Sequence, residues 1–357
     1  MNKTRYIFVA CLSLVLMVAL AACAPASEPT PGQDGSPITL VFTTHDPEST
    51  WWVQNIIKPW LNEIEQASGG RIKIEPHWGG ELVDLRDAYD AVVKGTVDIA
   101  YFNPGMIPGQ FPLDEFCVLL SPDKINWRPS MTYWELIQQF PEMQAEYSET
   151  QLLAVGKFFQ PYLGTGTKPI KSFADMKGLR WLSVSEWSTK RLEAWGAVPA
   201  NVPPADLYTS LQRGILDGCT TSLNTLFGNK LGEVIKYITK VSNESNNIAV
   251  VMNKDKWNSL PPDLQEILRS QGLKFIQMFD EAQIAADKEF REKAIKEYNI
   301  QFIELPQEEV EKFKAAGAAV LDDLAATLDA KGLPGTKVKE AFLQLEEKYS
   351  APEYEPK

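Results

Sequence analysis

The chain has 357 residues, of which 44% are hydrophobic and 23% charged, and its formal net charge is -12. This length suits two lobes or two domains better than one core, and the composition is that of a globular protein. The negative charge argues against a nucleic-acid partner, because binding phosphates requires clustered Lys and Arg side chains.

The N-terminus has the pattern of a secretory signal. Two basic residues precede an apolar run at 7–22, and Cys23 follows a Leu-Ala-Ala sequence. A transmembrane anchor is the alternative, but the run is shorter than the ~20 apolar residues that cross a bilayer. Leu-Ala-Ala-Cys resembles a bacterial lipobox, which implies a signal peptide at 1–22 and a lipid on Cys23. Residues 23–37, rich in Pro, Gly and Ser, are then expected to form a flexible tether.

The chain contains four cysteines. Cys11 belongs to the expected signal, and Cys23 is the expected lipidation site. Cys117 and Cys219 remain. An oxidising compartment would allow a disulfide between them, and two buried thiols are the alternative.

Strands and helices alternate in the first part of the mature chain. Apolar spacing predicts a strand at 39–43, a helix at 53–64 with a bend at Pro59, a strand at 71–75, a helix at 85–92 and a strand at 97–102. Gly95 follows the second helix, where a glycine supplies the left-handed residue that ends a helix. Helices of this length between strands predict a parallel sheet.

The same plan returns further along the chain. We expect a strand at 178–184, a helix at 186–195, a short strand at 198–202, a helix opened by Pro203 and a buried strand that begins near residue 215. Gly214 repeats the helix-ending role of Gly95. Two lobes with this layout are expected to face each other across a cleft that holds a small molecule.

The remaining segments are expected to connect the lobes. These segments are a strand at 152–159, a returning strand at 248–252, a helix from 262 to about 298 that crosses both lobes, and a strand at 300–305. The first lobe is predicted to comprise 38–159 and 248–287, and the second 160–247 and 288–350.

Binding residues are expected where strands end, because ligands of parallel sheets bind outside the carboxyl ends of the strands. Those ends are 43–46, 76–78 and 101–104 in the first lobe and 183–187, 201–203 and 220–224 in the second. The candidates at or near them are Thr44, His45, Trp52, Trp78, Phe102, Asn103, Tyr162, Ser183, Trp187, Thr221 and Asn224. The alternative for the aromatic members is a place in the core or at its rim.

Six segments together resemble the solute-binding proteins of tripartite ATP-independent periplasmic (TRAP) transporters, the DctP-like group. They are Gly-Gly-Arg-Ile-Lys-Ile at 69–74, Trp-Gly-Gly-Glu-Leu at 78–82, and the stretches 93–100, 168–179, 208–218 and 257–261. The resemblance implies an α/β fold of two lobes, each a mostly parallel sheet flanked by helices, with a long connecting helix. It also implies delivery of an organic acid to a membrane permease.

The sequence departs from this family at two positions. The family's arginine that grips the ligand carboxylate corresponds to Leu182, which has no planar donor. Arg180 would replace it only after a shift in register, and Lys168 is another candidate cation, with an exposed lysine as the alternative. The family usually continues Asp-Gly with Gln-Glu-Asn. In this chain Asp217-Gly218 is followed by Cys219, Thr220 and Thr221, so Thr221 stands in place of the Asn. The concentration of aromatic residues suggests a ligand larger or more apolar than a C4-dicarboxylate.

An enzyme is not expected. Only two histidines occur, His45 and His77, and the chain lacks HExxH, paired CxxC, GxSxG and GKS/GKT motifs. No cofactor or metal is therefore predicted. The sequence favours a lipid-anchored solute receptor in the periplasm or on the outer face of the cytoplasmic membrane. A ligand sensor for a membrane signalling partner is the alternative, and a secreted hydrolase is a third, less favoured one.

Overall fold

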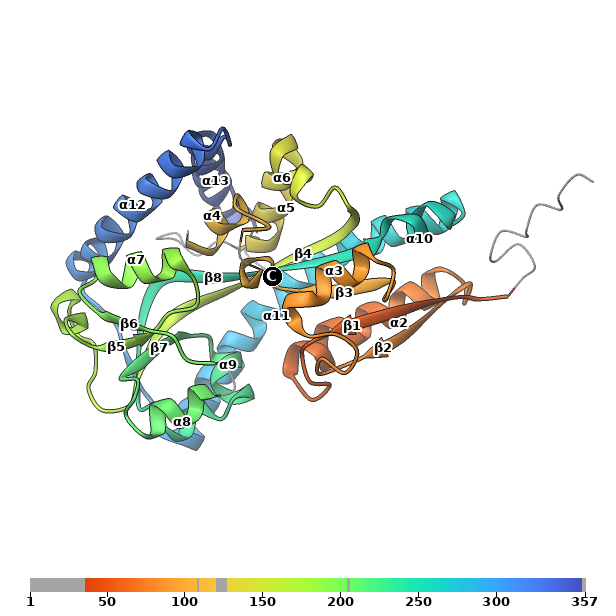
Figure 1. Ribbon diagram of the computed structural model, residues 1–357. Coiled ribbons are helices and arrows are strands. Elements are labelled where there is room, and N and C mark those ends of the chain that lie inside the picture. Colours follow the sequence, from red (N-terminus) through yellow and green to blue (C-terminus); the bar gives the residue numbers. More distant parts are fainter. Residues whose placement is uncertain (1–35, 108, 120–126, 204–205, 355–357) are drawn as a thin grey trace, which may run out of the picture.

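The computed structural model describes residues 36–107, 109–119, 127–203 and 206–354, which form two α/β lobes (Figure 1). Within these residues one sheet of nine strands runs through both lobes in the order β2-β1-β3-β8-β4-β7-β5-β6, and β9 pairs with β8. The outer pairs are parallel, whereas β3, β8, β4 and β7 pair antiparallel. The two-lobed α/β fold is confirmed, with a mixed sheet that joins the lobes.

The strands are β1 Ile38–Thr44, β2 Ile72–His77, β3 Ile99–Phe102, β4 Thr150–Thr165, β5 Arg180–Leu182, β6 Val198–Ala200, β7 Gly218–Thr221, β8 Tyr237–Asn253 and β9 Gln301–Ile303. The helices are α2 Lys58–Ala67, α3 Ala88–Val93, α4 Asp114–Leu119, α5 Pro129–Gln139, α6 Pro141–Glu146, α7 Glu186–Ala194, α8 Leu207–Gln212, α9 Leu223–Gly228, α10 Lys254–Ser259, α11 Pro262–Tyr298, α12 Gln307–Ala330 and α13 Gly335–Tyr349. A π-helical turn, Val53–Ile57, precedes α2, so Pro59 lies in the first turn of an α-helix, where proline is tolerated.

The repeated plan predicted from the sequence is present in both lobes. β1 pairs in parallel with β3, and β5 pairs in parallel with β7. Gly95 and Gly214 have φ of 71° and 65°, as expected for the left-handed residue after a helix. These two glycines turn the chain into the strand that ends at the cleft in each lobe.

β4 and β8 are much longer than the strands predicted at 152–159 and 248–252. They form one antiparallel ladder from Thr150 paired with Asn253 to Thr165 paired with Tyr237, with irregularities after Leu152 and after Gln160. The sequence analysis missed the extension because polar residues interrupt the apolar pattern at the junction of the lobes. The lobes are therefore joined by continuous strands rather than by loops.

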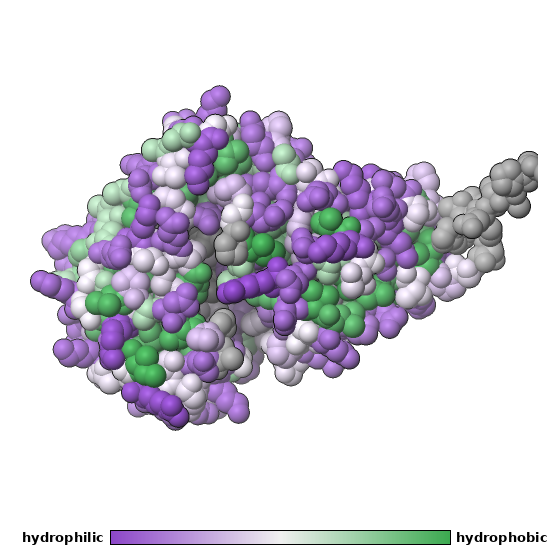
Figure 2. All heavy atoms as spheres, viewed as in Figure 1, coloured by the Kyte–Doolittle hydropathy of each residue, from purple (hydrophilic) through white to green (hydrophobic). Residues whose placement is uncertain are grey.

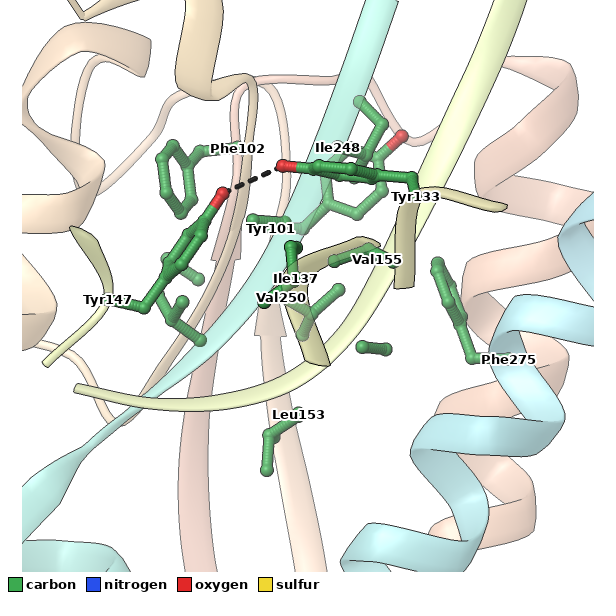
Figure 3. Packing of buried hydrophobic residues seen from close by; sticks show 14 of the residues in the cluster. Tyr101, Phe102, Tyr133, Ile137, Tyr147, Leu153, Val155, Ile248, Val250 and Phe275 are labelled. Carbon is green, nitrogen blue, oxygen red and sulfur yellow. Dashed lines mark hydrogen bonds between the residues drawn. The ribbon is translucent and has the colours of Figure 1, made fainter. Parts of the chain in front are cut away.

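The hydrophobic core is divided between the lobes, and α11 contributes to both parts. Its residues up to Phe279 pack in the cluster of the first lobe, and Ala286, Phe290 and Ala294 pack in a cluster of the second. Figure 3 shows the first-lobe cluster, in which the hydroxyl groups of Tyr133 and Tyr147 lie 2.8 Å apart. The predicted helix across both lobes is confirmed over its full length.

The C-terminal helices differ from the predicted lobe assignment. We assigned 288–350 to the second lobe, but the buried residues of α13 and of the second half of α12 pack with the first-lobe core. Phe313, near the start of α12, still packs in the second lobe. At about 1.5 Å per residue, a helix of this length is long enough to cross from one lobe to the other.

Some predictions concern parts that the structure does not describe. The expected signal peptide, Cys23 and nearly all of the tether lie outside the described residues, as does the side chain of Cys117. Cys219 is buried in β7. Because the side chain of Cys117 is not described, the disulfide stays a prediction. Among the described helices, none combines the length and the apolar character that a membrane span requires.

Candidate functional site

The first wall of the candidate site lies at the carboxyl ends of β1 and β3. Thr44 and Tyr101 are paired across these strands, so their side chains lie on the same face. Asp46 follows β1 and is only 7% exposed. Its carboxyl accepts a hydrogen bond from Thr44 Oγ1 at 3.4 Å and lies 3.6 Å from His45 Nε2. Burial raises the pKa of Asp46, although His45 and the Trp52 side chain act against the shift.

Aromatic rings continue this wall toward the second lobe. The rings of Trp52 and Phe158 pack edge to face with centroids 5.4 Å apart, and Phe158 packs on Phe279 of α11 at 4.7 Å. Trp52 and Phe158 are each only partly buried. The packing on α11 therefore holds an aromatic surface that remains partly exposed at the junction of the lobes.

The opposite wall belongs to the second lobe and to α11. A small hollow, partly open to solvent, is lined by Ser222, Leu223, Asn224, Gln283 and Asp287. Tyr162 donates a hydrogen bond to Asp287 at 2.9 Å and is paired across the sheet with Thr221. Burial raises the pKa of the Asp287 carboxyl, although its bond to Tyr162 and nearby Lys and Arg charges lower it. The side-chain oxygen of Asn224 is buried and has no hydrogen-bond partner among the described residues.

The two walls meet along α11. Gln283 donates from Nε2 to the backbone oxygen of Lys157 at 2.9 Å, next to Phe158 of the aromatic wall. Trp51 packs against both core clusters, and its ring lies 5.9 Å from that of Phe290. The face of the molecule drawn in Figure 2 is hollowed between the lobes. The arrangement is a cleft with an aromatic side, a polar side and a helix as its floor.

Phe102 and Asn103 occupy packed positions. Phe102 is fully buried, and its ring centroid lies 5.7 Å from those of Tyr89 and Phe111, so it is a core residue and not the cleft residue that we predicted. Asn103 is buried and donates from Nδ2 to the backbone oxygen of Asn247 at 3.3 Å. It joins β3 to β8 at the edge of the cleft.

Three further candidates have protein partners. The Trp78 ring packs on Phe42 with centroids 5.8 Å apart. The Ser183 hydroxyl lies 2.7 Å from Thr189 Oγ1. Trp187 of α7, in the second lobe, packs within the core cluster of the first. Their binding roles stay predictions, and Trp187 gains a structural role as a contact between lobes.

The candidate replacement cations do not lie in the cleft. Arg180 is exposed at the start of β5 and is bound to Asp217, with guanidinium-to-carboxylate distances of 2.8 and 2.9 Å. This pair lies at the opposite end of the strand from Leu182, which packs partly buried against the second-lobe cluster. Lys168 is exposed, and its backbone oxygen accepts a bond from Thr165. We therefore withdraw Arg180 as a substitute for the family arginine.

Sequence reasoning missed several residues of these walls. Tyr101 stood at a predicted strand end but was not named as a candidate, Phe158 was read as part of a strand, and Gln283 and Asp287 as part of a connecting helix. The available signal was polarity within an apolar stripe: Asp280, Gln283 and Asp287 are spaced three and four residues apart on the buried side of α11. Within the described ranges, no three His, Cys, Asp or Glu side chains come together as a metal site.

A two-lobed α/β molecule with a cleft between the lobes, crossed by strands and a long helix, is a solute-binding protein. Residues 42–122 and 133–328 match the bacterial extracellular solute-binding protein family 7, DctP. The chain belongs to this family, and it is a TRAP-type solute receptor of the extracytoplasmic space.

Individual relatives agree with this assignment. The chain is 27% identical over 273 residues to the YiiZ protein of Salmonella typhimurium, covering 73% of this chain and 80% of that one. It is 28% identical over 178 residues to the C4-dicarboxylate-binding periplasmic protein DctP of Rhodobacter capsulatus, covering 48% and 52%. A TRAP solute-binding protein from Rhodoferax ferrireducens T118, solved with copurified benzoate, has a TM-score of 0.81 and 27% identity over 88% of this chain and 98% of that one.

Proposed function

We propose that this receptor binds an organic acid built on an apolar ring, closes its lobes on it and delivers it to the membrane permease of a TRAP-type transporter. The wall of Trp52 and Phe158 carries the proposal, because two partly buried rings at the lobe junction offer an aromatic surface to the ligand. The benzoate complex of the Rhodoferax protein supports the same ligand class.

Neutral donors would hold the carboxylate of such a ligand. Leu182 occupies the position of the family arginine, so a two-pronged salt bridge is not available there. Ser222 and Asn224 line one hollow and carry a hydroxyl and an amide group, whereas the amide of Gln283, in the same lining, already donates to the backbone oxygen of Lys157. Neutral hydrogen bonds are about half as strong as charge-assisted ones, so ring contacts must supply much of the affinity. Asp287 borders the same hollow, where burial raises the pKa of its carboxyl while Tyr162, Lys240 and Arg291 lower it.

Contacts between the lobes support a closing movement. Trp51 reaches from the first lobe to Phe290, and Trp187 reaches from the second lobe into the first-lobe core. A ligand that touches both walls stabilises the closed arrangement by its greater affinity for that state. The permease would then recognise the surface that closure creates.

A panel of compounds tests the ligand class. We expect benzoate and cyclohexanecarboxylate to raise the melting temperature of the mature protein by several degrees at saturating concentration, because binding to the folded state stabilises it by about 2.7 kcal/mol at 100 times Kd. Succinate, malate, phenol and glucose should give smaller shifts. Calorimetric titration should then give a measurable Kd for the ring acids. Binding of the dicarboxylates alone, or of uncharged compounds alone, would contradict the proposal.

Attachment to the membrane is a separate part of the proposal. The lipobox-like sequence before Cys23 supports a lipid anchor, with the segment after it as tether. Expressed with its signal in a bacterium that processes lipoproteins, the Cys23→Ser chain should move from the membrane fraction to the soluble fraction and keep its ligand affinity. Cys11→Ser, which alters the other cysteine near the N-terminus, is the matched control and should stay with the membrane. If Cys23→Ser also remains in the membrane, the anchor is not on this residue.

A further inference from the structure

The first-lobe wall contains buried polar atoms that lack a hydrogen-bond partner. Among the residues that the structure describes, none bonds to the hydroxyl of Tyr101 or to Nδ1 of His45. Tyr101 is only 1% exposed. An unsatisfied buried group costs roughly 1–3 kcal/mol, so such a group calls for an explanation, of which a bound partner is one.

These atoms are gathered around the Asp46 carboxyl. His45 Nε2 lies 3.6 Å from it, and the Trp52 side chain and Tyr101 each interact electrostatically with it. In Figure 3 the Tyr101 hydroxyl points away from Leu153, toward the end of the cluster where β4 enters the second lobe. The unpartnered hydroxyl of Tyr101 is therefore at the end of the core cluster that lies toward the second lobe.

The same tryptophan belongs to the aromatic wall. The Trp52 ring packs against Phe158, and the same side chain also interacts with the carboxyl of Asp46. A ligand ring that lies on this wall would bring its edge toward the polar groups. The first-lobe wall is thus suited to a ring that carries a polar substituent.

We propose that Tyr101 and Asp46 bind a hydroxyl group on the ring of the ligand, so that the preferred ligand is a hydroxylated ring acid. A hydroxyl both donates and accepts, which matches the Asp46 carboxyl acceptor beside the Tyr101 hydroxyl donor. A second carboxylate on the ligand would lie next to Asp46 and be repelled, and an ammonium group would leave the Tyr101 donor unused. This inference rests on the proposed function and specifies the ligand of the same cleft.

The test compares benzoate with its three monohydroxy derivatives by calorimetric titration. The wild-type protein should bind one hydroxybenzoate at least about 10-fold more tightly than benzoate, because a site that hydrogen-bonds a hydroxyl rejects the analogue without it. Tyr101→Phe removes a single oxygen and should abolish that preference, so that the hydroxybenzoate and benzoate bind with equal affinity. Asp46→Asn, as a second variant, should also reduce the preference.

A measurement without ligand separates this role from a structural one. Because the hydroxyl of Tyr101 lacks a partner, Tyr101→Phe should leave the melting temperature of the free protein unchanged or raise it. A lower melting temperature, or an equal loss of affinity for benzoate and its hydroxy derivative, would overturn the inference. If benzoate binds and no hydroxybenzoate binds more tightly, the inference fails and the proposed function stands. If no ring acid binds the wild-type protein, both fail.

Discussion

Replacing Trp52 with alanine is expected to weaken the binding of a ring acid by at least about 30-fold. The ring is partly exposed at the lobe junction, packs on Phe158 and is supported from behind by Phe279. A rigid aromatic residue in such a position typically contributes 2 kcal/mol or more to binding when it is truncated to alanine. Calorimetric titration of the variant with the tightest ring acid measures the loss.

Two other variants make the result specific. Trp52→Phe keeps an apolar ring and should retain most of the affinity for benzoate, which distinguishes ring contact from the hydrogen bond of Nε1. Arg180→Ala removes a guanidinium that is bound to Asp217 at the far end of β5, so affinity should be unchanged. If Arg180→Ala abolishes binding and Trp52→Ala does not, the carboxylate is held by that arginine and our placement of the site is wrong.

The second large effect is expected at Gly272, where α11 touches the sheet. A Cβ added here would lie 2.0 Å from the backbone oxygen of Leu153, far closer than atoms can approach. Gly272→Ala must therefore push the helix off β4, which we expect to reduce the free energy of unfolding by about 3 kcal/mol or more. Chemical denaturation of the mature protein, followed by circular dichroism, measures this loss.

Gly317 provides the matched control for this substitution. It also lies inside a helix, α12, but a Cβ added there has no atom within 4 Å among the described residues. Gly317→Ala should therefore stabilise the protein by up to about 1 kcal/mol, since alanine is the better helix former. Equal effects of the two substitutions would mean that helix propensity, and not the contact between α11 and β4, determines the response at Gly272.

Local patterns were sufficient to predict the elements that end at the cleft. The glycines at 95 and 214 marked where helices stop, and the residues after each begin a buried strand. The apolar periodicity after Pro261 predicted α11 with nearly its observed bounds. These features depend on neighbours in sequence, which a single chain displays directly.

The site itself depends on contacts that sequence does not display. Tyr101 resembles any core residue of a strand until its hydroxyl is found without a partner. Arg180 was a plausible cation for a carboxylate until Asp217, thirty-seven residues away, was found bound to it. The assignment of α13 to the second lobe was wrong for the same reason. The apolar face of α13 fits either core, and only the path of α12 determines that it packs with the first-lobe core.

The shared strands also limit how this receptor can be divided. β4 and β8 are hydrogen-bonded to each other along both lobes, and each lobe is built from segments of the chain on either side of them. A fragment containing one lobe would expose strand edges that the intact chain covers, and exposed edges of this kind promote aggregation. Dissection into separately produced lobes is therefore a poor route to studying either half. The chain has to be handled as a single unit, although its cleft divides it into two.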